Sequence, residues 1–279
     1  MIPFEFVYLR PDALAEALQA HREFALAGRT ALYYAGGSEI ITMSRVGAIR
    51  PDAVIDIKNI PELTALSVDH ESLTIGAALT LNQIKESGLF PLLSLACGRI
   101  ADHTNQCRIT LGGNLCGTIL YRETSLPLLL SDAEVTLCGP EGERTVPFGS
   151  AFQGRMRLNP GELVARVRVP SWALMARHAH IKRTAQEKID YPLVNVTALW
   201  KDGALRAAFS GLAAQPLRSP EVEAILNDRG ATPENRASGA ARLLSEFARS
   251  DAEGSGEYRL FVVRNALQAL LEDWENGAL

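Results

Sequence analysis

The sequence of 279 residues predicts an α+β protein in three consecutive parts. The first part alternates strand-like and helix-like stretches and leads into a Gly-Gly pair, which favours a small parallel α/β unit. The middle part mixes strands, a hairpin and helices without continuing that alternation. The last part has a strong hairpin signal followed by helices. We place these parts at residues 1–58, 59–170 and 171–279.

The first part begins with the strand-like stretch EFVYLR, which is followed by a helical pattern. The helix carries an apolar stripe at helical spacing, formed by Leu14, Ala17 and Leu18. The stretch TALYYA then predicts a short buried strand that runs directly into Gly36-Gly37. Residues 53–57 (AVIDI) predict a further strand, so the order is strand, helix, strand, glycine loop, strand.

The middle part starts with two strands in LSVDHESLTIGAALTL and a helix near NQIKES. The stretch PLLSLACGRIAD predicts a helix whose inward positions are Leu92, Leu95, Ala96 and Ile100. The stretch AEVTLCGPEGERTVPF predicts a hairpin that turns at Gly139-Pro140, and ELVARVRVP predicts a further strand. This combination predicts a mixed antiparallel sheet with helices.

The last part contains two strands around Asp202-Gly203, a dipeptide typical of tight hairpins. A helix is expected to start at Ser219, with the side chain as N-cap and Pro220 in the first turn. The final helix places one apolar face on Leu260, Val263, Leu267, Leu270 and Trp274. Residues 250–258 (SDAEGSGEY) are expected to form a flexible connector before it.

Composition narrows the class of protein. A net charge of −4 argues against nucleic acid or a membrane surface as the main partner, and no apolar run is long enough for a membrane span. The N-terminus has no secretory signal pattern, so we expect a cytoplasmic protein. Cysteines stand at four scattered positions without a CxxC pair, which indicates reduced thiols rather than a zinc or disulfide framework: Cys97, Cys107, Cys116 and Cys138.

Two glycine pairs are the main candidates for a binding site. Gly36-Gly37 and Gly112-Gly113 both follow apolar stretches and could form two walls of one groove. Glycine lets main-chain N–H groups approach phosphate oxygens closely, and neutral hydrogen-bonding side chains stand beside both pairs. These are Ser38, Thr110 and Asn114. Each pair alone is also typical of a simple turn, and neither matches the Rossmann or P-loop pattern.

Other candidate sites are weaker. His178 and His180 form an H-x-H pair, which we interpret as surface histidines because no further ligand stands at metal-binding spacing. No nucleophile elbow or HExxH motif occurs. Between Arg155 and Arg183 there are seven Lys or Arg residues and a single acid, Glu162. This stretch predicts either a solvated face or an edge that faces an anion or a partner.

Six motifs, taken together and in order, resemble a known family. They are YYAGGSEI, RPDAVIDIKNIPEL, LTIGAALTLNQI, TLGGNLCG, LPLLLSDAEVTL and HIKRTAQEKIDYPLVNV. The chain resembles the FAD-binding medium subunit of the xanthine dehydrogenase and carbon monoxide dehydrogenase family of molybdenum hydroxylases. The resemblance implies a two-part FAD-binding domain of the PCMH type, followed by an α+β C-terminal domain with a small antiparallel sheet and helices.

The resemblance also assigns FAD-binding positions in this sequence. Those of the first loop are Tyr34, Ala35, Gly36, Gly37, Ser38, Glu39, Ile40 and Ile41. Those of the second loop are Thr110, Leu111, Gly112, Gly113 and Asn114. Val164 falls on an apolar position near the flavin ring, and Lys182 falls on a lysine that contacts the flavin. Ile100 and Glu123 complete the set.

Several positions depart from the family pattern. Glu123 stands where an aspartate is usual, and Ile100 stands where an aromatic residue is usual. Gln106 and Cys107 replace an Arg-Asn pair just before the second loop. These departures lie near the expected flavin, so they motivate an alternative in which the chain is a cofactor-free structural subunit.

The resemblance implies an electron-transfer role. FAD would receive electrons from the iron–sulfur clusters of a small partner subunit and pass them to NAD or another acceptor. Substrate oxidation would take place on a large partner subunit that carries the molybdenum cofactor. We expect no catalytic acid–base residue and no metal ligand in this chain. A stand-alone flavin reductase is a further alternative.

Overall fold

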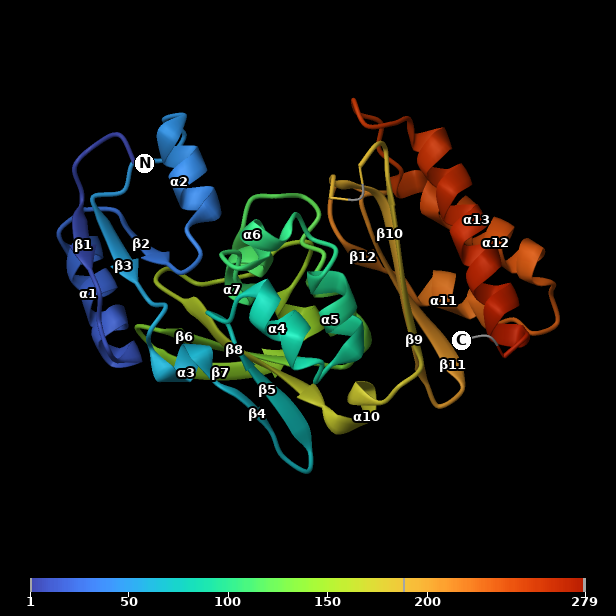
Figure 1. The fold of residues 1–279 in the computed structure, drawn as a ribbon, viewed down its shortest axis with the longest axis horizontal. Helices are drawn as coiled ribbons and strands as arrows, with labels where there is room; N and C mark the ends of the chain where they lie inside the picture. The colour runs from blue at the N-terminus through green and yellow to red at the C-terminus, as the bar shows by residue number, and fades with distance from the viewer. Residues whose placement is uncertain (1, 188, 278–279) are drawn as a thin grey trace.

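The structure is a computed structural model that describes residues 2–187 and 189–277. It contains three separate sheets, and helices pack against each of them (Figure 1). Each sheet lies within one of the three predicted sequence ranges, while the boundaries between the parts remain a prediction. The predicted α+β class is confirmed.

The N-terminal unit is a three-stranded parallel sheet with strand order β1-β3-β2. Its elements are β1 (Val7–Leu9), α1 (Leu14–Leu26), β2 (Ala31–Tyr34), α2 (Ser38–Arg45) and β3 (Ala53–Asp56). Ala17 of α1 and Ile55 of β3 are fully buried in the core of this unit. The parallel strands bring the ends of β2 and β3 to one edge of the sheet, and the first glycine loop lies at this edge.

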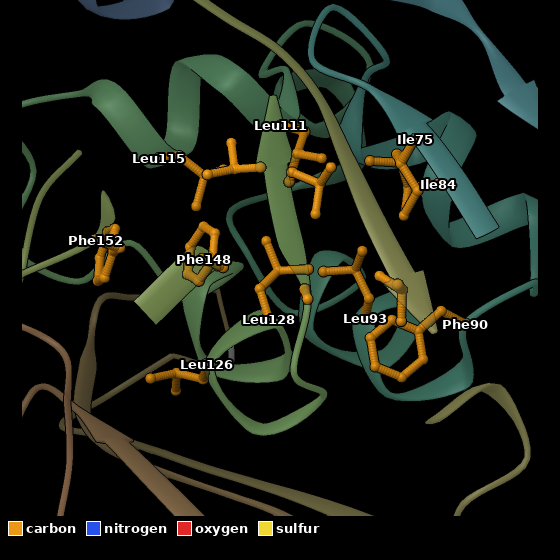
Figure 2. Close-up of a cluster of buried hydrophobic side chains, with 14 of the residues drawn as sticks. Ile75, Ile84, Phe90, Leu93, Leu111, Leu115, Leu126, Leu128, Phe148 and Phe152 are labelled. Atoms are coloured by element: carbon orange, nitrogen blue, oxygen red, sulfur yellow. The ribbon is translucent and has the colours of Figure 1, made fainter. Parts of the chain in front are cut away.

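The middle part is a five-stranded antiparallel sheet with strand order β4-β5-β8-β6-β7. Its strands are β4 (Leu66–Val68), β5 (Ser72–Gly76), β6 (Glu134–Gly139), β7 (Gly142–Pro147) and β8 (Leu163–Pro170). Its helices are α3 (Pro61–Thr64), α4 (Leu81–Ser87), α5 (Pro91–Cys97), α6 (His103–Gln106), α7 (Leu111–Cys116), α8 (Ser125–Leu130) and α9 (Phe148–Ala151). Leu111 and Leu115 of α7 lie in the apolar core between these helices and the sheet (Figure 2).

The C-terminal part is a four-stranded antiparallel sheet with strand order β12-β11-β10-β9. Its strands are β9 (His178–Thr184), β10 (Pro192–Lys201), β11 (Ala204–Ser210) and β12 (Leu217–Arg218). Its helices are α10 (Ser171–Leu174), α11 (Pro220–Leu226), α12 (Pro233–Leu244), η1 (Ser245–Phe247) and α13 (Gly256–Glu275). Figure 1 shows α11, α12 and α13 on the outer side of this sheet, while α5 and α8 of the middle part contact its strands.

Three local predictions were wrong. Leu95 was expected to face inward, but it is 43% exposed, because α5 buries its neighbours at positions 92, 93, 96 and 97 instead. The predicted connector at 250–258 is an ordered turn: Asp251 pairs with Gly254, and α13 begins at Gly256. His180 is buried rather than on the surface, because β9 is covered by the middle part.

Candidate functional site

The first glycine loop presents free main-chain donors. Gly37 has a left-handed backbone conformation, with φ of +72°, and serves as N-cap of α2. Among the described residues, no protein acceptor bonds to the N–H groups of positions 38, 39 and 40, whereas Ile41 N–H donates to Gly37 O at 2.9 Å. The Ser38 hydroxyl oxygen is buried without a hydrogen-bond partner in that part of the chain. Open donors at a helix N-terminus suit an anionic group such as a phosphate.

The aromatic residue before this loop is held from two sides. A Cβ at Gly37 would overlap the ring of Tyr34, so only glycine lets the ring lie against the loop. The Lys58 ammonium lies 4.6 Å from the centroid of the same ring and donates to Asp56 at 2.6 Å. Ala35, Ile40 and Ile41 are partly buried beside them. The loop is thus fixed at the carboxyl edge of the parallel sheet, where α/β folds commonly bind ligands.

The main-chain donors of the second glycine pair are bonded within the described part of the chain, unlike those of the first loop. The pair lies in the first turn of α7, where the Thr110 hydroxyl accepts from Gly113 N–H at 3.2 Å. Leu111 N–H donates to the carbonyl of residue 79 at 2.9 Å, and Gly112 N–H donates to Ala77 O at 2.8 Å. A Cβ at Gly112 would lie 3.0 Å from the Ala77 side chain. The glycine therefore serves close packing of α7 on the chain after β5.

The first loop lies against the chain segment that leads into the second loop. A Cβ at Gly36 would overlap the carbonyl oxygen of Arg108, two residues before the N-cap of α7. Beyond the same helix, both carboxylate oxygens of Glu39 lie 2.9 Å from the N–H of Thr118. Segments on both sides of α7 therefore contact the first loop and the start of α2.

Asn114 fixes α7 to the start of α8. Its side-chain oxygen accepts from the Thr124 hydroxyl at 2.6 Å and from the Thr124 N–H at 3.3 Å. Both side chains are buried. The Asn114 side-chain oxygen is thus used within the protein, and a cofactor contact through its amide nitrogen stays a prediction.

A buried ionic network joins the middle part to the C-terminal sheet. The Lys182 ammonium lies 3.1 Å from Glu123 Oε1 and donates to Arg99 O at 2.7 Å. Asn195 Nδ2 donates to Glu123 Oε1 at 2.8 Å and to the Ser210 hydroxyl at 3.2 Å. Burial raises the pKa of the Glu123 carboxyl, while the positive charge of Lys182 acts in the opposite direction. The structure thus brings two predicted site residues, Glu123 and Lys182, into direct contact.

Ile100 and Val164 lie outside the loops. Ile100 is buried after α5, one residue beyond the carbonyl that accepts from Lys182. Val164 is buried in β8 and is followed by Ala165, whose carbonyl accepts from Ala77 N–H at 2.9 Å. Because Ala77 also accepts from α7, Val164 is connected to the second loop through the backbone.

Two residues that organise the site were not predicted as site residues. Gln106 donates its amide to the carbonyls of residues 98, 100 and 101 at 3.1–3.2 Å. Arg122 is buried with a φ of +33° and donates to Gly117 O at 2.7 Å and to Gly154 O at 2.8 Å. Burial lowers the pKa of Arg122, and the charge of Glu39 opposes this shift. The only sequence signal was that Gln106 stands where the family pattern differs, and nothing in the sequence analysis singled out Arg122.

Comparison with known families identifies the fold. Residues 3–172 match the FAD binding domain in molybdopterin dehydrogenase, and residues 180–274 match the CO dehydrogenase flavoprotein C-terminal domain. The chain belongs to this family of molybdenum hydroxylase flavoproteins. The resemblance drawn from the six motifs is therefore confirmed, and FAD is the cofactor of the family.

Relatives of this flavoprotein match along nearly its whole length. The carbon monoxide dehydrogenase medium chain of Hydrogenophaga pseudoflava is 27% identical over 286 residues, which covers 96% of this chain and 98% of that one. The glyceraldehyde dehydrogenase medium chain of Sulfolobus acidocaldarius is 26% identical and covers 95% and 96%. The putative xanthine dehydrogenase FAD-binding subunit of Escherichia coli K12 is 25% identical.

Solved structures share the fold of this flavoprotein. Carbon monoxide dehydrogenase from Hydrogenophaga pseudoflava, in a form that lacks the Mo-pyranopterin moiety, matches with a TM-score of 0.86 at 26% identity and covers 96% of each chain. Quinoline 2-oxidoreductase from Pseudomonas putida 86 shares the fold, with a TM-score of 0.84 over 99% of this chain and 98% of that one.

The flavoprotein's own residues fit FAD at the first loop. Its open N–H groups and the unpartnered Ser38 hydroxyl are donors with no acceptor in the described part of the chain. An anionic diphosphate supplies the acceptors that such donors need. Across residues 2–187 and 189–277, no grouping of His, Cys, Asp and Glu is suited to a metal ion. Nor is any helix in those ranges both long and apolar enough to cross a membrane.

Proposed function

We propose that this chain is the electron-transfer medium subunit of a molybdenum hydroxylase complex. Electrons would arrive from the iron–sulfur clusters of a small partner subunit and leave to NAD or another acceptor. The medium-chain names of several relatives, each matched over almost its full length, support this role. When bound, FAD supplies the redox chemistry that amino-acid side chains lack.

The chain's contribution is to bind and orient this cofactor. The single observation that carries the proposal is the set of open N–H groups at positions 38–40, at the start of α2. These groups would hold the diphosphate. The second loop would act as a wall beside the cofactor rather than as a donor, because its N–H groups are bonded within the protein. Val164, Ile100 and Lys182 remain proposed contacts of the flavin half.

Calorimetric titration of the purified full chain with flavins tests the proposal. FAD is expected to saturate a single site and to bind about tenfold or more tightly than riboflavin, because riboflavin lacks the diphosphate that the first loop receives. Equal affinities would contradict the diphosphate assignment. A chain that binds no FAD, alone or with its partner subunits, would remove the proposed function.

A cofactor-free structural subunit is the second candidate. The observation that favours it is the closed network at Lys182, whose ammonium already bonds to Glu123 and to Arg99 O. Denaturing extraction of the assembled complex decides between the two. Release of about one flavin per copy of this chain supports the electron-transfer function. Release of no flavin supports the structural role.

The partners and compartment complete the proposal. We expect a small iron–sulfur subunit and a large molybdenum-cofactor subunit to co-purify with this chain, as the family assignment suggests. The four cysteines are free thiols, and Cys97 and Cys138 are buried. Free thiols are typical of reducing compartments, which supports a cytoplasmic location.

A further inference from the structure

The side chain of Glu39 connects two segments that lie far apart in the sequence. Glu39 is in the first turn of α2, and its carboxylate accepts from the N–H of Thr118, 79 residues further along the chain. Both oxygens lie 2.9 Å from that nitrogen. A Cβ at Gly117 would lie 2.9 Å from Glu39 Oε2, so the carboxylate fits closely against the backbone there. We call this contact the Glu39–Thr118 clamp.

The direction of this side chain has a consequence for the open donors. An acidic side chain in the first turn of a helix often interacts with the free N–H groups of that turn. Glu39 instead bonds to the Thr118 N–H, and the donors at positions 38–40 stay free. A carboxylate directed at these donors would also repel a diphosphate. In the clamp, the Glu39 carboxylate therefore bonds to Thr118 and leaves the N–H groups of positions 38–40 available to an anion.

The charge of Glu39 is balanced by a neighbouring arginine. Arg122 donates to the carbonyl of Gly117, which is adjacent to Thr118, and its guanidinium interacts electrostatically with the Glu39 carboxylate. A negative charge close to the loop is thus offset by a buried positive charge. This balance reduces the electrostatic cost of a second anion at the helix N-terminus.

We infer that Glu39 is a positioning residue, which holds the first glycine loop in the conformation that binds FAD without contacting FAD through its side chain. The inference rests on the proposed function. It assigns to Glu39 a role different from that of a cofactor ligand. Gly36 contacts Arg108 before α7 and Glu39 contacts Thr118 after it, so the two contacts together fix the loop relative to this helix.

The clamp and FAD binding are thermodynamically linked. If the clamp favours the FAD-binding conformation, FAD must stabilise the clamp by the same factor. The Thr118 amide reports on this directly, because its hydrogen exchange with solvent slows when its hydrogen bond is maintained. FAD is therefore expected to slow exchange at Thr118, although the amide itself is outside the proposed diphosphate site.

Three variants of the full chain test the inference. Glu39→Ala removes the clamp, and its FAD dissociation constant is expected to rise by about tenfold or more, the change expected of one charge-assisted hydrogen bond. Glu39→Gln keeps an acceptor oxygen and is expected to stay within about threefold of the wild type. Glu16→Ala is the matched control, because Glu16 also accepts a backbone N–H near the first turn of a helix, that of Asp12, but on α1.

Two measurements separate the outcomes. FAD affinity is measured by calorimetry, and Thr118 exchange is measured by NMR with and without FAD, after thermal unfolding has shown that each variant is folded. Glu39→Ala with unchanged affinity and exchange overturns the inference while leaving the proposed function intact. A Glu39→Gln loss as large as that of Glu39→Ala also overturns it, because the charge itself would then be required. A wild-type chain that binds no FAD overturns the proposed function and the inference together.

Discussion

Gly36 has no room for a side chain, because a Cβ at this position would overlap the carbonyl oxygen of Arg108. Gly113 is different, since a Cβ there would meet only the Thr110 hydroxyl at 3.0 Å. Gly149 in α9 has open space around its Cβ position. The three positions therefore differ in the space available for a side chain, which is absent at Gly36, tight at Gly113 and open at Gly149.

Replacement of Gly36 by Val is expected to abolish FAD binding and to lower the free energy of unfolding by about 2 kcal/mol or more, because the first loop must move away from α7. Gly149→Ala is expected to change the unfolding free energy by less than about 1 kcal/mol and to leave FAD affinity unchanged. Urea unfolding and FAD titration measure both effects. Retained FAD affinity in Gly36→Val would show that the contact with Arg108 is not needed for the cofactor.

Single residues also mark the limit of sequence-based prediction at the site. The glycine pattern identified both loops, since glycine permits close approach wherever it occurs. It did not reveal that only the first loop keeps free donors. That difference depends on Ala77 and on the carbonyl of residue 79, which lie about 35 residues away in sequence from α7 and become its neighbours only in the folded sheet.

At the scale of elements, α7 depends on the N-cap at Thr110. Its hydroxyl accepts from Gly113 N–H, and the helix has only six residues, so one cap bond is a large share of its local stabilisation. Thr232 caps α12 of the C-terminal part through an equivalent bond from Asn235 N–H at 3.3 Å. The two threonines make the same kind of cap bond, but only Thr110 lies beside the glycine loops, so Thr232 is the matched control.

Thr110→Val and Thr232→Val are each expected to lower the unfolding free energy by about 1 kcal/mol. FAD affinity is expected to fall only in Thr110→Val, because α7 forms the wall beside the first loop. Chemical denaturation and calorimetric titration of both variants check this. An equal loss of FAD affinity in the two variants would mean that the effect comes from general destabilisation.

Most elements could be predicted from local patterns. The hairpin at Asp202-Gly203 and the helix that begins after Ser219 formed as expected, since their signals are contained in a few adjacent residues. Leu95 and His180 were placed wrongly because their surroundings come from other elements. β9, which carries His180, contacts α5 of the middle part, and no pattern within HAHIKRT contains this information.

At the scale of the whole molecule, the covered position of β9 affects stability at acidic pH. His180 is buried, with Nδ1 2.9 Å from the Thr197 hydroxyl. Burial, together with the nearby positive charges of Arg99 and Lys182, lowers its pKa from 6.5 to about 3. Below pH 6.5 the unfolded chain takes up a proton on this ring and the folded chain does not, until the pH approaches 3.

The folded state is therefore expected to lose stability as the pH falls from about 6.5, by roughly 2–3 kcal/mol at pH 4.5 from His180 alone. His180→Gln is expected to flatten this part of the stability profile, because the substituted side chain does not titrate. His70→Gln changes an exposed ring and serves as the control. Urea unfolding midpoints, measured at a few pH values from about 7 to about 4.5, give the slope of stability against pH for each variant. Parallel profiles for wild type and His180→Gln would contradict the prediction.

The ionic network at Glu123 has a practical consequence for dividing this polypeptide. Both side chains that bond to Glu123, Lys182 and Asn195, belong to the C-terminal sheet. A shortened gene product that stopped at residue 172 would contain both glycine loops, yet it would leave this carboxylate facing solvent where a sheet had covered it. Residues 1–172 and residues 173–279 are accordingly expected to be soluble when they are produced as one chain. Each piece is expected to give little soluble protein when it is expressed alone.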